Sequence, residues 1–316
     1  MSAEREDRRP GSSPRDPDPE GVGPGWRAIL ASLDRLPQGA LSRLFGRLAD
    51  VPLPRPLRRP ILGAFVRFTG IRMEEAAEPM ERYGSINDLF VRRLAPGLRS
   101  WPDDPTLVTS PVDGVLGACG TIQGGTLIQA KGLDYRAADL LAASADRYEG
   151  GLFLTLYLSP RHYHRIHTPL PGRVIRARHV PGRLLPVNAP SVRSVEGLFA
   201  TNERLVAELD TAAGRVAVVA VGATNVGRIS AAFDPEWAGG PEASVTNRPS
   251  PVPPERDYPG GVPVEAGGEL MAFHLGSTVV LLTEPGLLPA PDAVSATEVM
   301  VGTILARPTT PEPSDA

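Results

Sequence analysis

Residues 275–282 read Leu275-Gly276-Ser277-Thr278-Val279-Val280-Leu281-Leu282, after a polar, glycine-rich approach over 266–269. The β-branched apolar run predicts a strand over 278–283. A Gly-Ser bond at the start of a strand is one at which a chain can cut itself, because Gly276 leaves its carbonyl carbon unshielded and Ser277 supplies a neighbouring hydroxyl. Attack by that hydroxyl, elimination and hydrolysis would convert Ser277 into a pyruvoyl group, an electron sink suited to amino-acid decarboxylation. Gly-Ser pairs are common in loops, so the rest of the chain decides what this one means.

The bulk composition is that of a soluble globular protein. Of 316 residues, 41% are hydrophobic and 22% charged, and the 33 glycines and 35 prolines favour turns and short strands over long helices. The single cysteine, Cys119, excludes an internal disulfide and is interpreted as a small core residue on a strand. No apolar run reaches the roughly 18 residues of a transmembrane helix, and the N-terminus lacks a hydrophobic signal core, so we expect a cytoplasmic protein.

The N-terminal third divides into a tail and a basic helical module. Residues 1–25 are Pro-, Gly- and charge-rich and predict a disordered tail, whereas 26–100 predict a helical, membrane-associating module. Helical spacing over 26–49 breaks at Pro37, and a second helix is predicted over 61–68. Nine arginines against two aspartates give residues 26–72 a charge of +7. This composition is typical of helices in a membrane interface, but a helical cap that buries its apolar stripe on the protein's own core remains an equal alternative.

The remainder predicts an α+β protein whose catalytic domain, over 101–306, is antiparallel, β-rich and sandwich- or barrel-like. A short helix capped by Ser85 precedes it, and a helical turn is predicted over 135–142. We interpret 234–263 as a long loop and 307–316 as a disordered tail. The predicted strands are 113–122, 125–130, 151–158, 172–180, 203–209, 214–222, 226–231 and 278–283.

A self-cleaving serine needs a base, and three of the five histidines cluster in residues 159–169, directly after the predicted strand at 151–158. His164 and His167 are three apart, so one helical turn would place them on one side. His162 and His179 are interpreted as surface or packing residues. A metal site is the weaker alternative and none is expected, because the cysteine is distant and no His-Glu-x-x-His pattern occurs. Asp113 is a carboxylate candidate, although Pro and Gly around it indicate an ordinary turn.

Six segments together resemble the phosphatidylserine decarboxylase family, bacterial type, in its uncut proenzyme form. They occur in the family's order over roughly residues 85–285. The segments are Ser110-Pro111-Val112-Asp113-Gly114; Gln129-Ala130-Lys131-Gly132; Tyr157-Leu158-Ser159-Pro160-Arg161 with Tyr163-His164-Arg165-Ile166-His167; Leu198-Phe199-Ala200-Thr201-Asn202-Glu203-Arg204; Val221-Gly222-Ala223-Thr224-Asn225-Val226-Gly227; and Leu275-Gly276-Ser277-Thr278.

The resemblance implies roles for the site residues. Asp113 would orient His167, and His167 would be the base for Ser277. His164 would handle a proton during decarboxylation. Cleavage between Gly276 and Ser277 would give a β chain, 1–276, and an α chain, 277–316, which stay together as a heterodimer. The cofactor would be pyruvate, present as a covalent pyruvoyl group at Ser277, and no metal would be needed.

The resemblance also implies the reaction and its setting. Phosphatidylserine in the bilayer would form a Schiff base with the pyruvoyl group and lose CO2 to give phosphatidylethanolamine, a step of phospholipid biosynthesis. The enzyme would be peripheral on the cytoplasmic face of the cell membrane, held by an anionic membrane surface, with no nucleic-acid partner. Where the family often has a lysine this chain has His274, which we interpret as a strand residue facing solvent. Asn202 and Arg204 fit either polar substrate contacts or a buried structural network.

Two other functions remain as hypotheses. A non-catalytic membrane-surface protein would use the basic helices and keep only the scaffold. A Ser-His-Asp hydrolase would never cut itself, but the chain lacks the Gly-x-Ser-x-Gly elbow that many such enzymes carry.

Overall fold

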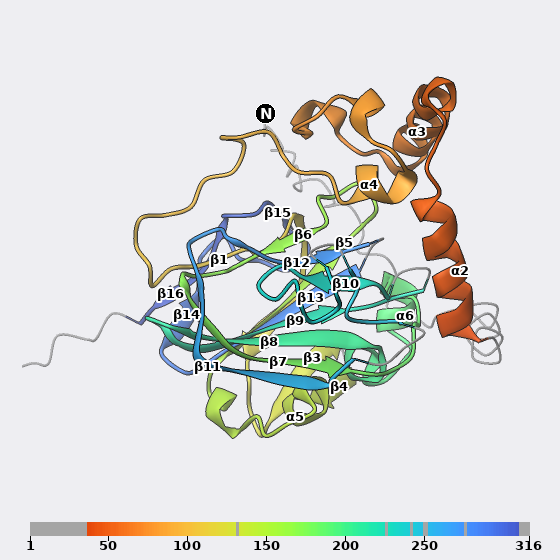
Figure 1. The fold of residues 1–316 in the computed structure, drawn as a ribbon. Helices are drawn as coiled ribbons and strands as arrows, with labels where there is room; N and C mark the ends of the chain where they lie inside the picture. The colour runs from red at the N-terminus through yellow and green to blue at the C-terminus, as the bar shows by residue number, and fades with distance from the viewer. Residues whose placement is uncertain are drawn as a thin grey trace, which may run out of the picture.

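The computed structural model describes residues 37–130, 133–224, 227–240, 243–248, 252–274 and 277–309. Within these ranges the chain forms a small helical part followed by a larger β-rich part (Figure 1). The predicted tail at 1–25 and the predicted helix over 26–36 lie outside the described residues. The predicted C-terminal tail begins too early, because strand β16 extends to Pro308 before the described residues end at 309.

The helical part occupies one side of the molecule, with α2 and α3 beside the β-rich part (Figure 1). Ser85 caps α4 as predicted, since its Oγ accepts a hydrogen bond of 3.0 Å from the backbone N–H of Asp88. The helix is short, as expected, and ends at Phe90. The elements are α2 (Gln38–Asp50), α3 (Arg55–Thr69), the 3-10 turns η1 (Met73–Glu75) and η2 (Met80–Arg82), and α4 (Ile86–Phe90).

Helix α3 starts earlier than the sequence predicted, and Pro60 lies inside it rather than before it. Pro60 is only six residues into the helix, so its missing N–H removes a single hydrogen bond near the open first turn. Leu62 then packs with Tyr83 and Leu89 in a small core of the helical part. The apolar spacing after Pro60 was therefore a correct helical signal, but proline was a wrong marker of the helix start.

An eight-stranded sheet forms the centre of the β-rich part, and every neighbouring pair of strands in it is antiparallel. Its strand order is β11-β7-β8-β9-β13-β5-β2-β15. The strands are β2 (Gly114–Thr121), β5 (Leu152–Leu158), β7 (Gly172–Val180), β8 (Arg204–Thr211), β9 (Gly214–Val221), β11 (Glu255–Val264), β13 (Ser277–Thr283) and β15 (Glu298–Val299).

Smaller sheets cover this central sheet. On one face lie the sheets β10-β12-β6 and β1-β16-β14, and on the other lies the pair β3-β4 with α5 and α7. The covering elements are β1 (Val108–Thr109), β3 (Thr126–Ala130), β4 (Leu133–Arg136), β6 (Arg165–His167), β10 (Ile229–Ala231), β12 (Glu269–Phe273), β14 (Leu287–Pro289), β16 (Ile304–Pro308), α5 (Ala137–Leu141) and α7 (Leu198–Thr201). The connections also contain the 3-10 turn η3 (Asp146–Tyr148) and the short helix α6 (Ala189–Val192).

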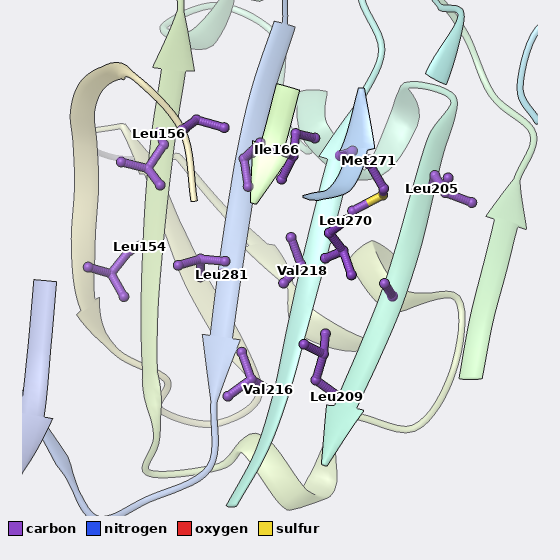
Figure 2. Close-up of a cluster of buried hydrophobic side chains, with 14 of the residues drawn as sticks. Leu154, Leu156, Ile166, Leu205, Leu209, Val216, Val218, Leu270, Met271 and Leu281 are labelled. Carbon is purple, nitrogen blue, oxygen red and sulfur yellow. The ribbon is translucent and has the colours of Figure 1, made fainter. Parts of the chain in front are cut away.

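The apolar run after Ser277 is continuous because both faces of β13 are buried. Val279 and Leu281 enter the core beneath the small sheets, whereas Val280 and Leu282 enter the core on the helical face. Figure 2 shows Ile166 and Met271 of the small sheet lying over the strands of the central one. The predicted α+β class with an antiparallel β-rich domain is confirmed. Among the described strands the central sheet has free edges at β11 and β15, so it does not close into a barrel.

The predicted loop over 234–263 is wrong in its second half, which forms β11. Pro259 lacks a ladder N–H, and the two glycines after it have φ values of +78° and +68°. These residues fall where the register with β7 shifts, between Asp257 and Val262, on an edge strand. Edges and bulges are the places in a sheet that tolerate proline.

Helices α2 and α3 present an unusual pattern of burial. Ser42, Gly46 and Ala49 of α2 are buried against the protein. Several large apolar side chains of the two helices and their connection are exposed: Leu44, Phe45, Leu48, Val51, Leu57 and Phe68, the last of them 90% exposed. The described helices include none that combines the length and apolar character needed to cross a bilayer.

Candidate active site

Ser277 is the first residue of β13 and pairs with Leu158 of β5. The next residue, Thr278, is paired on both sides, with Tyr157 and with Val221. Thr278 is buried, and its Oγ1 has no hydrogen-bond partner among the described residues. Leu275 and Gly276 lie outside the described residues, and of Ser277 only the position in the strand is described.

Asp113 lies directly before β2 and is buried. Its carboxylate accepts hydrogen bonds from Arg99, at 3.1 Å from Nε and 2.5 Å from Nη2, and from the backbone N–H of Val301 at 2.8 Å. Arg99 also pairs with Glu75 of the helical part, at 2.9 Å. The turn interpretation of Asp113 is therefore incomplete, because its side chain bonds residues distant in sequence.

His167, at the end of β6, has both ring nitrogens engaged. Its Nδ1 lies 2.6 Å from the carbonyl oxygen of Gly267, and its Nε2 lies 3.1 Å from the hydroxyl of Tyr163. A carbonyl only accepts, so Nδ1 carries the proton in the neutral ring and Nε2 holds the basic lone pair. Among the described residues no hydrogen bond joins Asp113 to His167, and the group that fixes its tautomer is Gly267.

Burial lowers the pKa of His167, while the Gly267 carbonyl and the Glu269 and Asp113 carboxylates partly oppose that shift. The imidazole is therefore neutral near pH 7 and able to accept a proton. Burial also raises the pKa of Tyr163, so its hydroxyl stays protonated beside Nε2. Gly267 has a φ of +68°, and a Cβ there would overlap the ring of Trp101, which packs near His167.

His164 is fully buried and its ring packs at a tilt of 39° against Phe90 of α4, with centroids 4.0 Å apart. Its Nδ1 lies 2.9 Å from the carbonyl oxygen of His162, whereas its Nε2 has no partner among the described residues. Burial, followed by the charge of Arg92, lowers its pKa well below the ordinary value. A buried nitrogen without a partner is costly, and such groups are common where a reacting molecule completes the bonding.

The histidine segment is not helical as its spacing suggested, because residues 165–167 form strand β6. In an extended chain, residues three apart point to opposite faces. His164 accordingly contacts Phe90, and His167 contacts Tyr163 and Trp101. His162 is a buried packing residue, whose Nδ1 accepts a hydrogen bond from the Ser159 N–H.

His274 does not face solvent, contrary to the prediction. It is buried, with Nδ1 beside the Asn87 amide and Nε2 3.1 Å from the Ser230 hydroxyl. Burial, together with the nearby charge of Arg228, lowers its pKa to about 3, so the ring is neutral. Its position at the end of a buried strand overrides its polarity.

The comparisons with known proteins agree on one family. The family model for phosphatidylserine decarboxylase matches residues 86–307. A phosphatidylserine decarboxylase proenzyme from Anaeromyxobacter sp. (strain K) is 48% identical over 262 residues, 82% of this chain and 90% of the relative. The proenzyme from Myxococcus xanthus (strain DK1622) is 42% identical with the same coverage, and that from Bordetella pertussis is 40% identical over 89% of this chain and 94% of the relative.

This chain belongs to the phosphatidylserine decarboxylase family. It is an enzyme, a decarboxylase, as the sequence resemblance implied. The matched span of the family model begins at the first residue of α4 and includes all four predicted catalytic positions, Asp113, His164, His167 and Ser277.

In this member of the family, sequence reasoning missed the residues that hold the site together. Arg99 binds Asp113, and Gly267 and Tyr163 bind His167. Tyr163 carried a signal because it lies in the histidine segment, and Gly267 lies in the glycine-rich approach over 266–269, whereas Arg99 carried none. Arg204 is buried and donates to the carbonyls of Leu140 and Asp139, so it belongs to a structural network. The described residues hold no cluster of three or more potential metal ligands.

Proposed function

We propose that this chain cuts itself between Gly276 and Ser277 and that the resulting enzyme decarboxylates phosphatidylserine to phosphatidylethanolamine at a membrane surface. The observation that carries the proposal is the family match over residues 86–307, which includes every group this chemistry needs. The proenzyme names of the relatives support a processing step.

Self-cleavage uses His167 and Ser277. Nε2 of His167 takes the hydroxyl proton, and Oγ bonds to the Gly276 carbonyl carbon, so that an ester replaces the amide. Loss of the Ser277 α-proton expels Gly276 as a carboxylate, and hydrolysis releases ammonia and leaves the ketone. Asp113 acts on His167 through its field, since its negative charge favours the imidazolium that forms.

Two buried side-chain atoms can serve a covalent pyruvoyl group in this proposal. Thr278 Oγ1 and His164 Nε2 are buried and lack partners among the described residues, so each has a hydrogen-bonding position to offer. When in place, the ketone supplies an electron sink for loss of the substrate carboxylate. His164, neutral because it is buried, accepts a proton at Nε2 and returns it to the substrate carbon that has lost CO2.

The two chains stay associated as a heterodimer in this proposal. The α chain, 277–316, begins with β13, which pairs along its length with β5 and β9 of the β chain. Its later strands β15 and β16 pair with β2 and β1. Cleavage at the start of β13 breaks none of these pairings.

Membrane binding is assigned to α2 and α3. Their exposed apolar side chains lie among exposed arginines at 47, 55, 59 and 67, a combination suited to an anionic lipid surface. Each arginine near such a surface contributes about 1 kcal/mol of attraction. The small residues of α2 pack on the protein, so the same helices serve as cap and as membrane contact. We place the enzyme as a peripheral protein on the cytoplasmic face.

Replacing both Leu48 and Phe68 by serine is expected to weaken binding to phosphatidylserine-containing vesicles at least about tenfold, since each large apolar side chain contributes roughly 1.5–3 kcal/mol when buried. Vesicle co-sedimentation measures the change. Leu288→Ser is the matched control, because Leu288 is 54% exposed on β14. Equal binding by the double variant and the wild type would contradict the assignment.

The proposed activity is tested by incubating purified protein with phosphatidylserine in neutral detergent and measuring released CO2 and phosphatidylethanolamine. A non-catalytic membrane protein would bind vesicles and release no CO2. A hydrolase that never cuts itself would react with a serine-directed phosphonate as one full-length chain.

A further inference from the structure

A cavity of about 320 Å³ lies between the helical part and the β-rich part, and neither Asp113 nor His167 lines it. Helices α2 and α4 provide one wall, through Asp50, Asn87 and Asp88. The β-rich part provides the other, through Arg165 of β6, Arg228 directly before β10 and His274 directly after β12. Its lining is mostly polar, and the proposed reaction leaves it without a role.

Arg228 is the cation best placed to exchange partners in this cavity. Its guanidinium forms a fork with the Asp50 carboxylate, with Nη1 2.5 Å from Oδ2 and Nη2 3.0 Å from Oδ1. The Arg228 Nε is buried and has no partner among the described residues. Asp50 lies at the end of α2 with its side chain 42% exposed, so it can turn to solvent. Arg165 differs, because it is buried and bound to Glu269 and to the Val91 carbonyl.

Helix α2 is shaped to hold this arginine. A Cβ at Gly46 would lie 3.0 Å from Arg228 Nε, so the glycine leaves room for the guanidinium plane. Asp50 is four residues further along, on the same face of the helix. Asp88, the other acidic group of the lining, already accepts a hydrogen bond from the Gly84 N–H at 2.6 Å.

One residue that lines the cavity, His274, is also close in sequence to the bond that the enzyme is proposed to cut. The backbone N–H of His274 donates to the carbonyl oxygen of Arg228 at 2.9 Å, and His274 precedes Ser277 by three residues. Because the His274 ring is neutral, Arg228 brings the positive charge to this point. In phosphatidylserine the phosphorus is only a few bonds from the amine that reacts at position 277.

We propose that Arg228 binds the phosphodiester of the lipid headgroup and that Asp50 occupies the same anion position when no lipid is present. An arginine fork that fits a carboxylate also fits two phosphate oxygens. The inference rests on the proposed function and adds the residue that recognises the headgroup. Helix α2 thereby links the membrane surface to the substrate site.

Kinetics in neutral detergent micelles separate the headgroup role from a structural one. Arg228→Ala is expected to raise KM for phosphatidylserine about tenfold or more and to weaken inhibition by phosphatidylethanolamine to a similar degree, because both lipids share the phosphodiester. Asp50→Ala is expected to lower KM, because it removes the competing carboxylate. Arg307→Ala, an exposed cation on β16, is the control and should leave both constants unchanged.

Binding to the uncut chain tests the inference independently of catalysis. In the Ser277→Ala background, calorimetry should show water-soluble short-chain phosphatidylethanolamine binding more weakly after Arg228→Ala and more tightly after Asp50→Ala. Equal weakening by both substitutions would mean that the ion pair only fixes α2, and would overturn the proposal. Arg228→Ala that raises KM for phosphatidylserine but leaves phosphatidylethanolamine binding intact would assign Arg228 to the serine carboxylate instead. If the wild-type protein released no CO2 while these binding shifts held in the Ser277→Ala background, the proposed function alone would be contradicted.

Discussion

His167→Ala is expected to leave the chain uncut between Gly276 and Ser277. The substitution removes the lone pair at Nε2, the only basic position of a ring whose Nδ1 is bound to the Gly267 carbonyl. Loss of a general base slows such a step by about 10²–10⁴-fold. Denaturing electrophoresis over time after synthesis should show one chain where the wild type shows two.

The matched control is His179→Ala, because the Nε2 of that histidine lies 2.8 Å from Glu203 Oε1 and no hydrogen bond among the described residues joins it to His167 or Tyr163. Burial lowers the pKa of His167 below the ordinary histidine value of 6.5, so the ring is already mostly the neutral base at pH 6.5. Processing by the wild type should therefore be independent of pH above 6.5 and slow only in more acidic solution. Normal cleavage of His167→Ala would refute the base assignment.

Ser277→Ala is expected to abolish both cleavage and decarboxylation, a larger effect than that of any other substitution. Without the hydroxyl no ester forms, and alanine at this position cannot become a ketone. The strand itself should persist, because β13 is held by Val279 to Leu282 in both cores. Intact-mass measurement and a CO2 assay provide the two readouts, and an unchanged thermal unfolding midpoint shows that the fold is retained. Residual decarboxylation by this variant would place the electron sink elsewhere.

The fold class could be predicted because apolar periodicity is a local property. The run 151–158 and the run 214–222 both appear as strands of the central sheet. Strand β11 was missed because Pro259 and its neighbouring glycines suppress the local signal, and only its edge position next to β7 makes a strand possible. The two-residue strands β1 and β15 depend on pairing with distant segments, which no window of sequence contains.

The reactive residues of the candidate site were named from motifs and their roles stay predictions, whereas the residues that bind them were missed. Asp113, His164 and His167 were named through a motif. Arg99 comes from a polar stretch without a pattern, so its contact with Asp113 is a tertiary event. His274 was misjudged for the same reason: polarity indicated solvent, whereas packing with Asn87 and Ser230 buried it.

The exposed apolar residues of α2 and α3 could not be placed from the sequence either. Helical spacing identifies an apolar stripe but not what covers it. The structure turns Gly46 and Ala49 toward the protein and leaves Leu48 and Phe68 outside. The cap alternative therefore describes the buried face of α2, and membrane contact stays a proposal for the exposed residues.

The most direct test of the account is the mass of the purified wild-type protein under denaturing conditions. We expect two chains, 1–276 and 277–316, with the smaller chain blocked at its N-terminus by a keto group that a carbonyl-reactive hydrazide labels. A single continuous chain of 33.6 kDa that keeps the serine hydroxyl at position 277 would contradict it.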